Sequence, residues 1–418
     1  MSIDKKNSIQ KIAFVNFGGI GDEVLFTPVI NEVHQYMPDA HLTLIVEDRA
    51  GNIKHLLPHV NSVIDVRVQG VSRISLFFKL LGILRSKYFD AVIASGSSPF
   101  IPLLLFLSGI PHRVGFRTGP VSKLLLSAEA PLDKKAYAAD MYFKLGRVFL
   151  DRFLPVSEKY LAPQHVAPKL ANLPDDDTQW ARSLLSRQGL KKILIHPGVS
   201  LVSVQKNILK SWPATHWAEL IQKLSKKHRV YLIGGPDDAR IISDIEQHLP
   251  ESVENFSNLY GQTKNLQQMA ALIQQADLLI SVDSAPMHFA VGYQTPVVAM
   301  FGPTDSTKLL PNSPDYRAVV LENLDCRPCL WDVRKTSCNT PVCLEVPVGK
   351  MLQAVAEVFR VSDNEPEEEI SEVNSEACLP IACFVKSSPE RFPPPRCMKM
   401  TMFSPLPIST PQPPRIFW

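Results

Sequence analysis

The chain has 418 residues, of which 45% are hydrophobic and 20% are charged. This composition is typical of a globular protein, and the length favours two domains over one. The formal net charge of +3 is too small to indicate binding to nucleic acid. The start of the chain is polar and unlike a signal peptide, and the longest apolar run, residues 100–110, is about half as long as a transmembrane helix. The sequence therefore indicates a cytoplasmic protein in which any membrane contact would be peripheral.

The first part of the chain alternates between apolar segments that favour strands and amphipathic segments that favour helices. The predicted strands are 11–17, 41–47 and 89–95, and the predicted helices are 23–36, 73–87 and 136–153. Such an alternation is typical of a parallel sheet covered by helices on both faces. A polar stretch with prolines, residues 155–178, then predicts a linker.

The same alternation restarts after the linker. The predicted strands are 191–196, 229–233, 277–282 and 296–301, and the predicted helices are 213–228, 266–275 and 347–360. We therefore expect two Rossmann-like α/β domains with parallel sheets that face each other across a cleft, over residues 1–170 and 171–361. Residues 362–418 are first acidic and then rich in proline, which predicts a disordered tail outside the function.

Polar clusters follow the predicted strands at their carboxyl ends, which is where ligands bind in open parallel sheets. The first cluster lies in "FGGIGDEVLFTP", residues 17–28. Gly19 and Gly21 allow the backbone to turn tightly and to approach a ligand. Asp22 is predicted at the N-cap of the next helix, where a carboxylate serves either as a helix cap or as a base that faces the cleft.

The second half holds the other clusters. Lys206 and Lys210 precede the helix at 213–228, where a lysine and the helix N-terminus could bind a phosphate together; for Lys206 we favour an ordinary solvated side chain. Asp283, Ser284 and His288 lie between two strands that look buried. The glycine turns at 233–239 and 301–306 could present backbone N–H groups to a diphosphate, and together with "DSAPMH" they suggest a nucleotide pocket.

Two further features have competing interpretations. Cysteines 326, 329, 338 and 343 could be zinc ligands, but their spacing is at the limit of usual zinc sites and structural thiols are the preferred interpretation. Residues 70–125 hold seven lysines and arginines against one acid, Asp90. This window is either a solvated helix face or a patch for an anionic acceptor or a phospholipid surface.

The set of motifs resembles glycosyltransferase family 9, the bacterial ADP-heptose:lipopolysaccharide heptosyltransferases and their relatives. The resemblance is carried by "GGIGDEVLFTP", "HPG…KSWP", "LIGGPDD", "SVDSAPMHFA…TPVVAMFGPT" and "CRPC…C…CL". It implies a GT-B fold with an N-terminal acceptor domain and a C-terminal nucleotide-sugar domain. It also implies inverting transfer with no metal and no cofactor. The chain departs from the family pattern at Asn16, where many members have arginine, at Ala285, where glycine is frequent, and in a longer loop at 198–210.

The resemblance implies a role for each candidate residue. Asp22 would be the catalytic base and Lys210 the phosphate-binding cation, with Gly19 and Gly21 in the acceptor-side loop. The diphosphate and sugar would be bound by Asp283, Ser284, His288, Gly302, Pro303 and Thr304, and the nucleoside by Asp237. The expected partners are an ADP-sugar donor, most simply ADP-heptose, and an anionic glycolipid acceptor at the inner face of the membrane. Two alternatives remain, a sugar-nucleotide epimerase of the same shape and a nucleotide-sugar-binding protein without catalysis.

Overall fold

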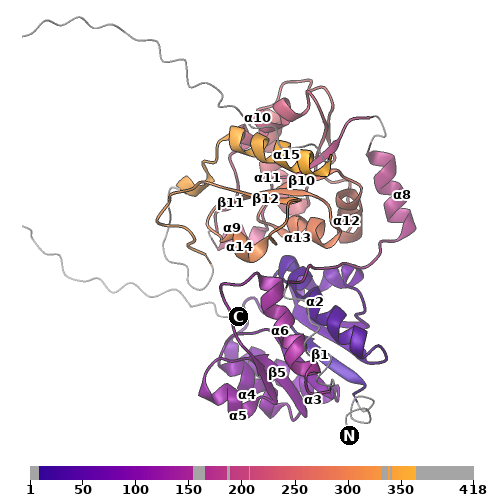
Figure 1. Cartoon of the computed structure of the whole chain (residues 1–418), viewed down its shortest axis with the longest axis vertical. Helices are drawn as coiled ribbons and strands as arrows, with labels where there is room; N and C mark the ends of the chain where they lie inside the picture. The colour runs from indigo at the N-terminus through magenta and orange to yellow at the C-terminus, as the bar shows by residue number, and fades with distance from the viewer. Residues whose placement is uncertain are drawn as a thin grey trace, which may run out of the picture. The chain divides into compact units, whose positions relative to one another are not determined.

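A computed structural model describes the chain over residues 9–153, 165–185, 189–206, 208–330, 338 and 341–363. Within these residues it forms two six-stranded sheets, one from each half of the sequence, in which all neighbouring strands are parallel (Figure 1). The α/β class predicted from the alternating pattern is confirmed. The predicted tail lies outside the described residues from residue 364 onward, and the domain boundaries at 170 and 361 stay a prediction.

The first sheet and its helices follow the order expected for βαβ units. The strands are β1 (Lys11–Val15), β2 (His41–Glu47), β3 (Ser62–Val66), β4 (Ala91–Ala94), β5 (His112–Phe116) and β6 (Ala128–Ala130). The helices are α2 (Ile20–Tyr36), η1 (Asp48–Leu56), α3 (Arg73–Ser86), α4 (Phe100–Leu107), α5 (Pro120–Leu125) and α6 (Ala138–Leu150).

The second half repeats this arrangement. The strands are β7 (Lys192–His196), β8 (Arg229–Leu232), β9 (Phe256–Asn258), β10 (Leu278–Val282), β11 (Val297–Phe301) and β12 (Tyr316–Val320). The helices are α8 (Asp175–Leu184), α9 (Leu201–Gln205), α10 (Ala214–Leu224), η2 (Pro236–Asp238), α11 (Ala239–Gln247), α12 (Leu266–Gln274), α13 (Ala285–Gly292), α14 (Ser306–Leu309), η3 (Val342–Leu344) and α15 (Val348–Ser362).

Strands near the sheet edges were not predicted. β3 has only one fully buried residue and β9 has none, so their sequences lack a continuous apolar signal. The apolar run at 100–110 contains α4 and is not a strand. Among the described residues, none of the helices is long and apolar enough to cross a membrane.

Each sheet is covered on both faces, as the alternation along its central strands requires. Phe14 of β1 packs into one apolar cluster and its neighbour Val15 into another. Leu194 of β7 belongs to the same cluster as Phe14, while Ile195 points into a separate cluster on the other face of the second sheet. One continuous core therefore joins the inner helices of the two halves.

A proline lies inside α2, the helix that carries the first glycine motif. Pro28 has no N–H to bond the carbonyl of Val24 four residues earlier. The Thr27 hydroxyl donates to that carbonyl at 2.7 Å instead. The buried helix is therefore continuous from Ile20 to Tyr36 despite the proline, with its first turn fixed at the end of β1.

The order of the strands shows where ligands would bind. The first sheet runs β3-β2-β1-β4-β5-β6 and the second β12-β11-β10-β7-β8-β9. Counted in chain order, both follow the Rossmann order 3-2-1-4-5-6. The winding direction reverses between β1 and β4 and between β7 and β10, and ligands bind at the carboxyl ends of such strand pairs.

Candidate active site

The winding direction of the first sheet reverses between β1 and β4, and we call this position the first switch point; the reversal between β7 and β10 is the second. A polar pair bridges the first switch point and positions the loop before Asp22. The Asn16 side chain, which follows β1, accepts a hydrogen bond from the hydroxyl of Ser95, which follows β4. Its amide nitrogen lies 3.4 Å from the Asp22 carbonyl, to which it donates. Asn16 is buried and occupies the position where arginine was expected, so an uncharged amide fixes the start of α2.

Asp22 lies in the first turn of α2, and its carboxylate accepts a hydrogen bond from the Gly19 N–H at 2.7 Å. Part of the residue remains accessible to solvent, but protein atoms surround the carboxylate. This desolvation raises the pKa of Asp22 above its usual range, although the Gly19 hydrogen bond and the charges of Arg49 and Lys210 oppose it. The hydrogen bond with Gly19 shows the capping role. The base role stays a proposal, and a raised pKa suits a general base.

Glu23 is a second carboxyl that the sequence analysis missed. It is fully buried, and its carboxylate has no hydrogen-bond partner in the described part of the chain other than the side chain of Asn16. Burial raises its pKa well above the usual range, and the neighbouring Asp22 and Glu47 carboxylates add to this. The signal was present in the helical spacing, because residue 23 shares the inner face of α2 with Phe26 and Ile30.

We expect Glu23→Gln to change how stability depends on pH. The folded chain binds the Glu23 proton more tightly than the unfolded chain does, because the pKa is raised on folding. This contribution to stability is complete below the unfolded pKa and is lost as the pH rises through the folded pKa. The melting temperature of Glu23→Gln, relative to the parent chain, should therefore increase between acidic and alkaline buffers. Glu251→Gln, at an exposed position, is the control and should show a flat difference; a flat difference for Glu23→Gln would contradict the assignment.

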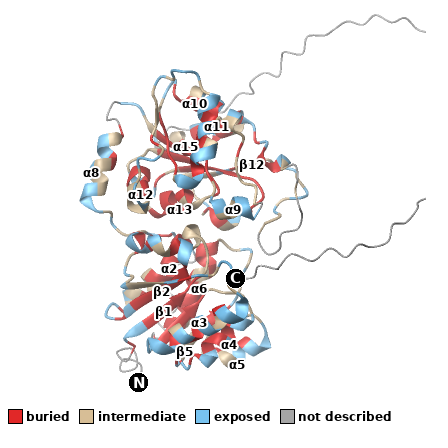
Figure 2. Ribbon diagram, turned by 180° about the vertical axis from the view of Figure 1, so that it is seen from behind, coloured by how far each residue is buried: buried red, intermediate tan, exposed pale blue. Residues whose placement is uncertain are grey.

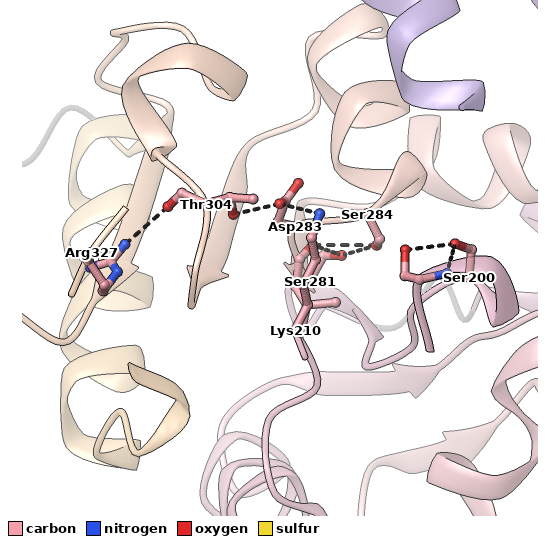
Figure 3. Close-up of polar contacts among 9 residues, drawn as sticks. Ser200, Lys210, Ser281, Asp283, Ser284, Thr304 and Arg327 are labelled. Atoms are coloured by element: carbon pink, nitrogen blue, oxygen red, sulfur yellow. Dashed lines mark hydrogen bonds and ion pairs between the residues drawn. The ribbon is translucent and has the colours of Figure 1, made fainter. Parts of the chain in front are cut away.

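The second switch point holds an ion pair (Figure 3). Asp283, directly after β10, accepts from the Lys210 amine at 2.6 Å and from the Thr304 hydroxyl at 2.7 Å through the same oxygen. Burial acts to raise the pKa of Asp283, but Lys210 and Thr304 outweigh it and hold the pKa below its usual range. Asp283 is 5% exposed and Lys210 is 18% exposed, so the pair is largely shielded from water.

A second polar chain crosses the same switch point and was not predicted. The Ser284 hydroxyl lies 3.3 Å from Nδ1 of His196 at the end of β7, and Nε2 of His196 lies 3.2 Å from the Asp238 carboxylate. A Cβ on Gly198 would lie 1.7 Å from Asp238 Oδ1, so only glycine fits in the turn after β7. The motifs "HPG", "GGPDD" and "DSAPMH" are thus joined through buried side chains.

His288 of α13 lies against Gly21 of α2, where the two halves meet. A Cβ built on Gly21 would be 2.5 Å from Cδ2 and 3.0 Å from Nε2 of His288. The ring is buried, and burial lowers the pKa of His288 to about 4, so the imidazole is neutral at pH 7. Its Nδ1 has no hydrogen-bond partner among the described residues.

We expect Gly21→Ala to lower strongly the rate of the transfer reaction that the resemblance implies, because the methyl group would displace the buried His288 ring. A displacement of about 1 Å near reacting groups can cost roughly 100-fold in rate. Gly19→Ala is a matched control in the same loop, since a Cβ there meets no atom closer than 3.8 Å. Initial rates of both variants, together with their melting curves, test this. Equal rates for the two variants would show that the close contact with His288 is unimportant.

The Gly302–Thr304 turn after β11 is held by an arginine that the sequence analysis did not select. The guanidinium of Arg327 donates to the carbonyls of Gly302, Leu321 and Thr304. Pro303 accepts from the backbone N–H groups of Cys329 and Leu330. These hydrogen bonds hold the turn whose Thr304 contacts Asp283, and Figure 3 shows the bond between Arg327 and Thr304.

The remaining candidates are Asp237, Lys206 and the cysteines. The exposed Asp237 carboxylate accepts from the Leu201 N–H at 2.9 Å and so fixes the start of α9. Lys206 is exposed at the end of α9, in contrast to Lys210. Cys326, Cys338 and Cys343 are free thiols, and no group of three or more possible ligands among the described residues is placed to hold a metal.

The family model of glycosyltransferase family 9 (heptosyltransferase) matches residues 77–339. The chain belongs to glycosyltransferase family 9. It is similar to lipopolysaccharide heptosyltransferase 3 of Escherichia coli K12, with 26% identity over 295 residues, 68% of this chain and 80% of that relative. It is also similar to lipooligosaccharide heptosyltransferase 2 of Haemophilus ducreyi, with 27% identity over 328 residues, 75% of this chain and 89% of that relative.

The fold is that of a solved family member. The structure of E. coli ADP-heptose lps heptosyltransferase II matches with a TM-score of 0.62 and 23% identity, covering 84% of this chain and all of that one. The resemblance to glycosyltransferase family 9 and the GT-B fold predicted from it are confirmed. The chain is therefore a glycosyltransferase by family, and the roles of single residues remain proposals.

Proposed function

We propose that the chain transfers a heptosyl group from ADP-heptose to a hydroxyl of a lipopolysaccharide core sugar, with inversion at the anomeric carbon. The observation that carries this proposal is the approach of one carboxylate and one amine from different halves. The Asp22 carboxylate lies close enough to Lys210 and Asp283 for their charges to affect its pKa. A base for the acceptor and a cation for the leaving group thus meet in one place.

In this mechanism Asp22 removes the proton from the acceptor hydroxyl as its oxygen attacks the anomeric carbon. The bond from that carbon to the diphosphate breaks, and ADP leaves with the electron pair. The raised pKa of Asp22 increases its proton affinity. The hydrogen bond from the Gly19 N–H orients the Asp22 carboxylate before substrate binds.

Lys210 provides positive charge for the departing diphosphate. In the structure its amine is paired with Asp283, which keeps the cation at a fixed position. Ser284, His288 and the Gly302–Thr304 turn surround this pair and would hold the diphosphate and sugar, and Asp237 would contact the nucleoside. In this scheme residues 1–170 bind the acceptor and residues 171–361 bind the donor. The acceptor is an anionic glycolipid, so the enzyme would act at the inner face of the cytoplasmic membrane.

The test uses the purified full chain with radiolabelled ADP-heptose, with and without lipopolysaccharide core that lacks heptose. We expect label on the acceptor, and no product when the acceptor is omitted. A chemically changed sugar without acceptor would instead show an epimerase. Donor binding without any product would show a protein that has lost catalysis.

A further inference from the structure

Helices α3, α4 and α5 expose an unusual number of large apolar side chains on neighbouring surfaces. The three helices lie side by side in both views (Figures 1 and 2), and α4 packs against each of the other two. The exposed set, called the α3–α5 face here, consists of Ile74, Phe78, Phe100, Leu103, Phe106, Leu107, Val121 and Leu124. Phe78 is 64% exposed, Phe100 60% and Leu124 81%. Contiguous apolar surface of this kind usually marks a binding site for a protein or a membrane.

The sequence of α4 contains no polar residue. Its inner side, with Ile101, Leu104 and Leu105, is buried in the apolar cluster beneath the sheet. Its outer side carries Phe100 and Leu103, which a surface helix would normally replace with polar residues. Core packing accounts for the inner residues only, so the outer residues need another partner.

Positive charge accompanies the face. Lys79, Lys87 and Lys123 are exposed around it, and no carboxylate among the described residues pairs with them. Arg85 donates to the carbonyl of Leu107 at the end of α4, and no carboxylate of the described residues is paired with it. The one acid of this window, Asp90, accepts instead from backbone N–H groups of the first strand. An apolar surface with a basic rim is complementary to an anionic phospholipid bilayer.

Part of the face lies at the edge of the sheet that carries Asp22. In a parallel sheet each crossover helix starts at the carboxyl ends of the strands. Ile74, Phe100 and Val121 stand in the first turns of their helices, after β3, β4 and β5. Phe100 follows Ser95, the residue that bonds Asn16 beside Asp22, by only five positions.

We propose that the α3–α5 face docks on an anionic bilayer, with its apolar side chains in the interfacial region and its lysines at the lipid phosphates. The carboxyl edge of the first sheet, with Asp22, then lies next to the headgroups, where a membrane-anchored acceptor presents its sugars. This last consequence rests on the proposed function, whereas the docking itself does not.

The test measures sedimentation of the full chain with vesicles that contain no glycolipid. Phosphatidylcholine vesicles are compared with vesicles that also contain phosphatidylglycerol. We expect binding only to the anionic vesicles, weakened by salt and lowered roughly fivefold by each of Lys79→Gln, Lys87→Gln and Lys123→Gln. Phe100→Ser combined with Leu124→Ser should lower it at least as much. Leu190→Ser and Val342→Ser, at positions that are 39% and 51% exposed in the second half, serve as matched controls and should bind normally.

Three outcomes would overturn the proposal. The first is absence of binding to anionic vesicles, and the second is equal binding to anionic and neutral vesicles. The third is a dimer in solution that the double variant Phe100→Ser, Leu124→Ser dissociates, because the face would then be a protein interface. Transfer to a water-soluble, deacylated acceptor should be unchanged in the face variants. If the parent chain also fails to transfer sugar to the deacylated acceptor, the proposed function is contradicted. The vesicle-binding result would still test the docking proposal.

Discussion

Asp22→Asn should lower the rate of transfer by roughly 100-fold or more, the usual scale for loss of a general base. The amide oxygen can still accept the hydrogen bond from Gly19, so the first turn of α2 should remain in place. Donor affinity should change little, because in the proposed mechanism Asp22 removes a proton from the acceptor and not from the donor. Steady-state rates with saturating donor, together with donor binding by calorimetry, measure the two quantities separately.

The dependence of kcat/KM on pH provides a second test of the role of Asp22. Because burial raises the pKa of Asp22, the acidic limb of kcat/KM should fall at a higher pH than for an ordinary aspartate. That limb should be absent from the residual activity of Asp22→Asn. Transfer close to the parent rate in the variant would reduce Asp22 to a helix cap.

Lys210→Ala should damage both catalysis and stability. It removes the cation expected to stabilise the leaving diphosphate, a loss of roughly 100-fold or more in rate. It also leaves Asp283 as a buried carboxylate without its partner, which can cost about 3 kcal/mol or more. Lys206→Ala, at the exposed end of α9, should change neither quantity much.

A double variant separates the two effects of Lys210. Asp283→Asn removes the unpaired charge that Lys210→Ala leaves behind, so the double variant should recover much of the lost melting temperature. It should not recover transfer, because no cation is restored. Recovery of transfer in the double variant, or equal losses for Lys206→Ala and Lys210→Ala, would place the phosphate contact elsewhere.

The sequence was informative wherever chemistry follows an apolar run. Asp283 comes directly after the buried strand β10, Asp22 lies in the first turn of the helix that follows β1, and Lys210 lies shortly before α10, so position along the chain was enough to select them. The central strands were found for the same reason. β3 and β9 were missed because strands at sheet edges are only half-buried and lack that signal.

Residues that act through a distant partner could not be selected in this way. His196 and Asp238 are ordinary in the sequence, and only the fold shows that they meet behind Ser284. Arg327 is similar, since two of its three carbonyl partners, Gly302 and Thr304, lie 25 and 23 positions before it in the sequence. Glu23 was overlooked because Asp22 beside it already explained the motif, although its place on the inner face of α2 marks it as buried.

The contact between Gly21 and His288 has a consequence for how the enzyme is made. Asp22 leaves the ribosome 266 residues before His288, from the difference of the two positions. At bacterial and eukaryotic elongation rates of about 5–20 residues per second, this interval lasts roughly 13–53 s. During that time the first half of the nascent chain already holds its base but has neither the Lys210–Asp283 pair nor the imidazole that packs on Gly21. Translation that stops early should therefore release an inert fragment and not a partly active transferase.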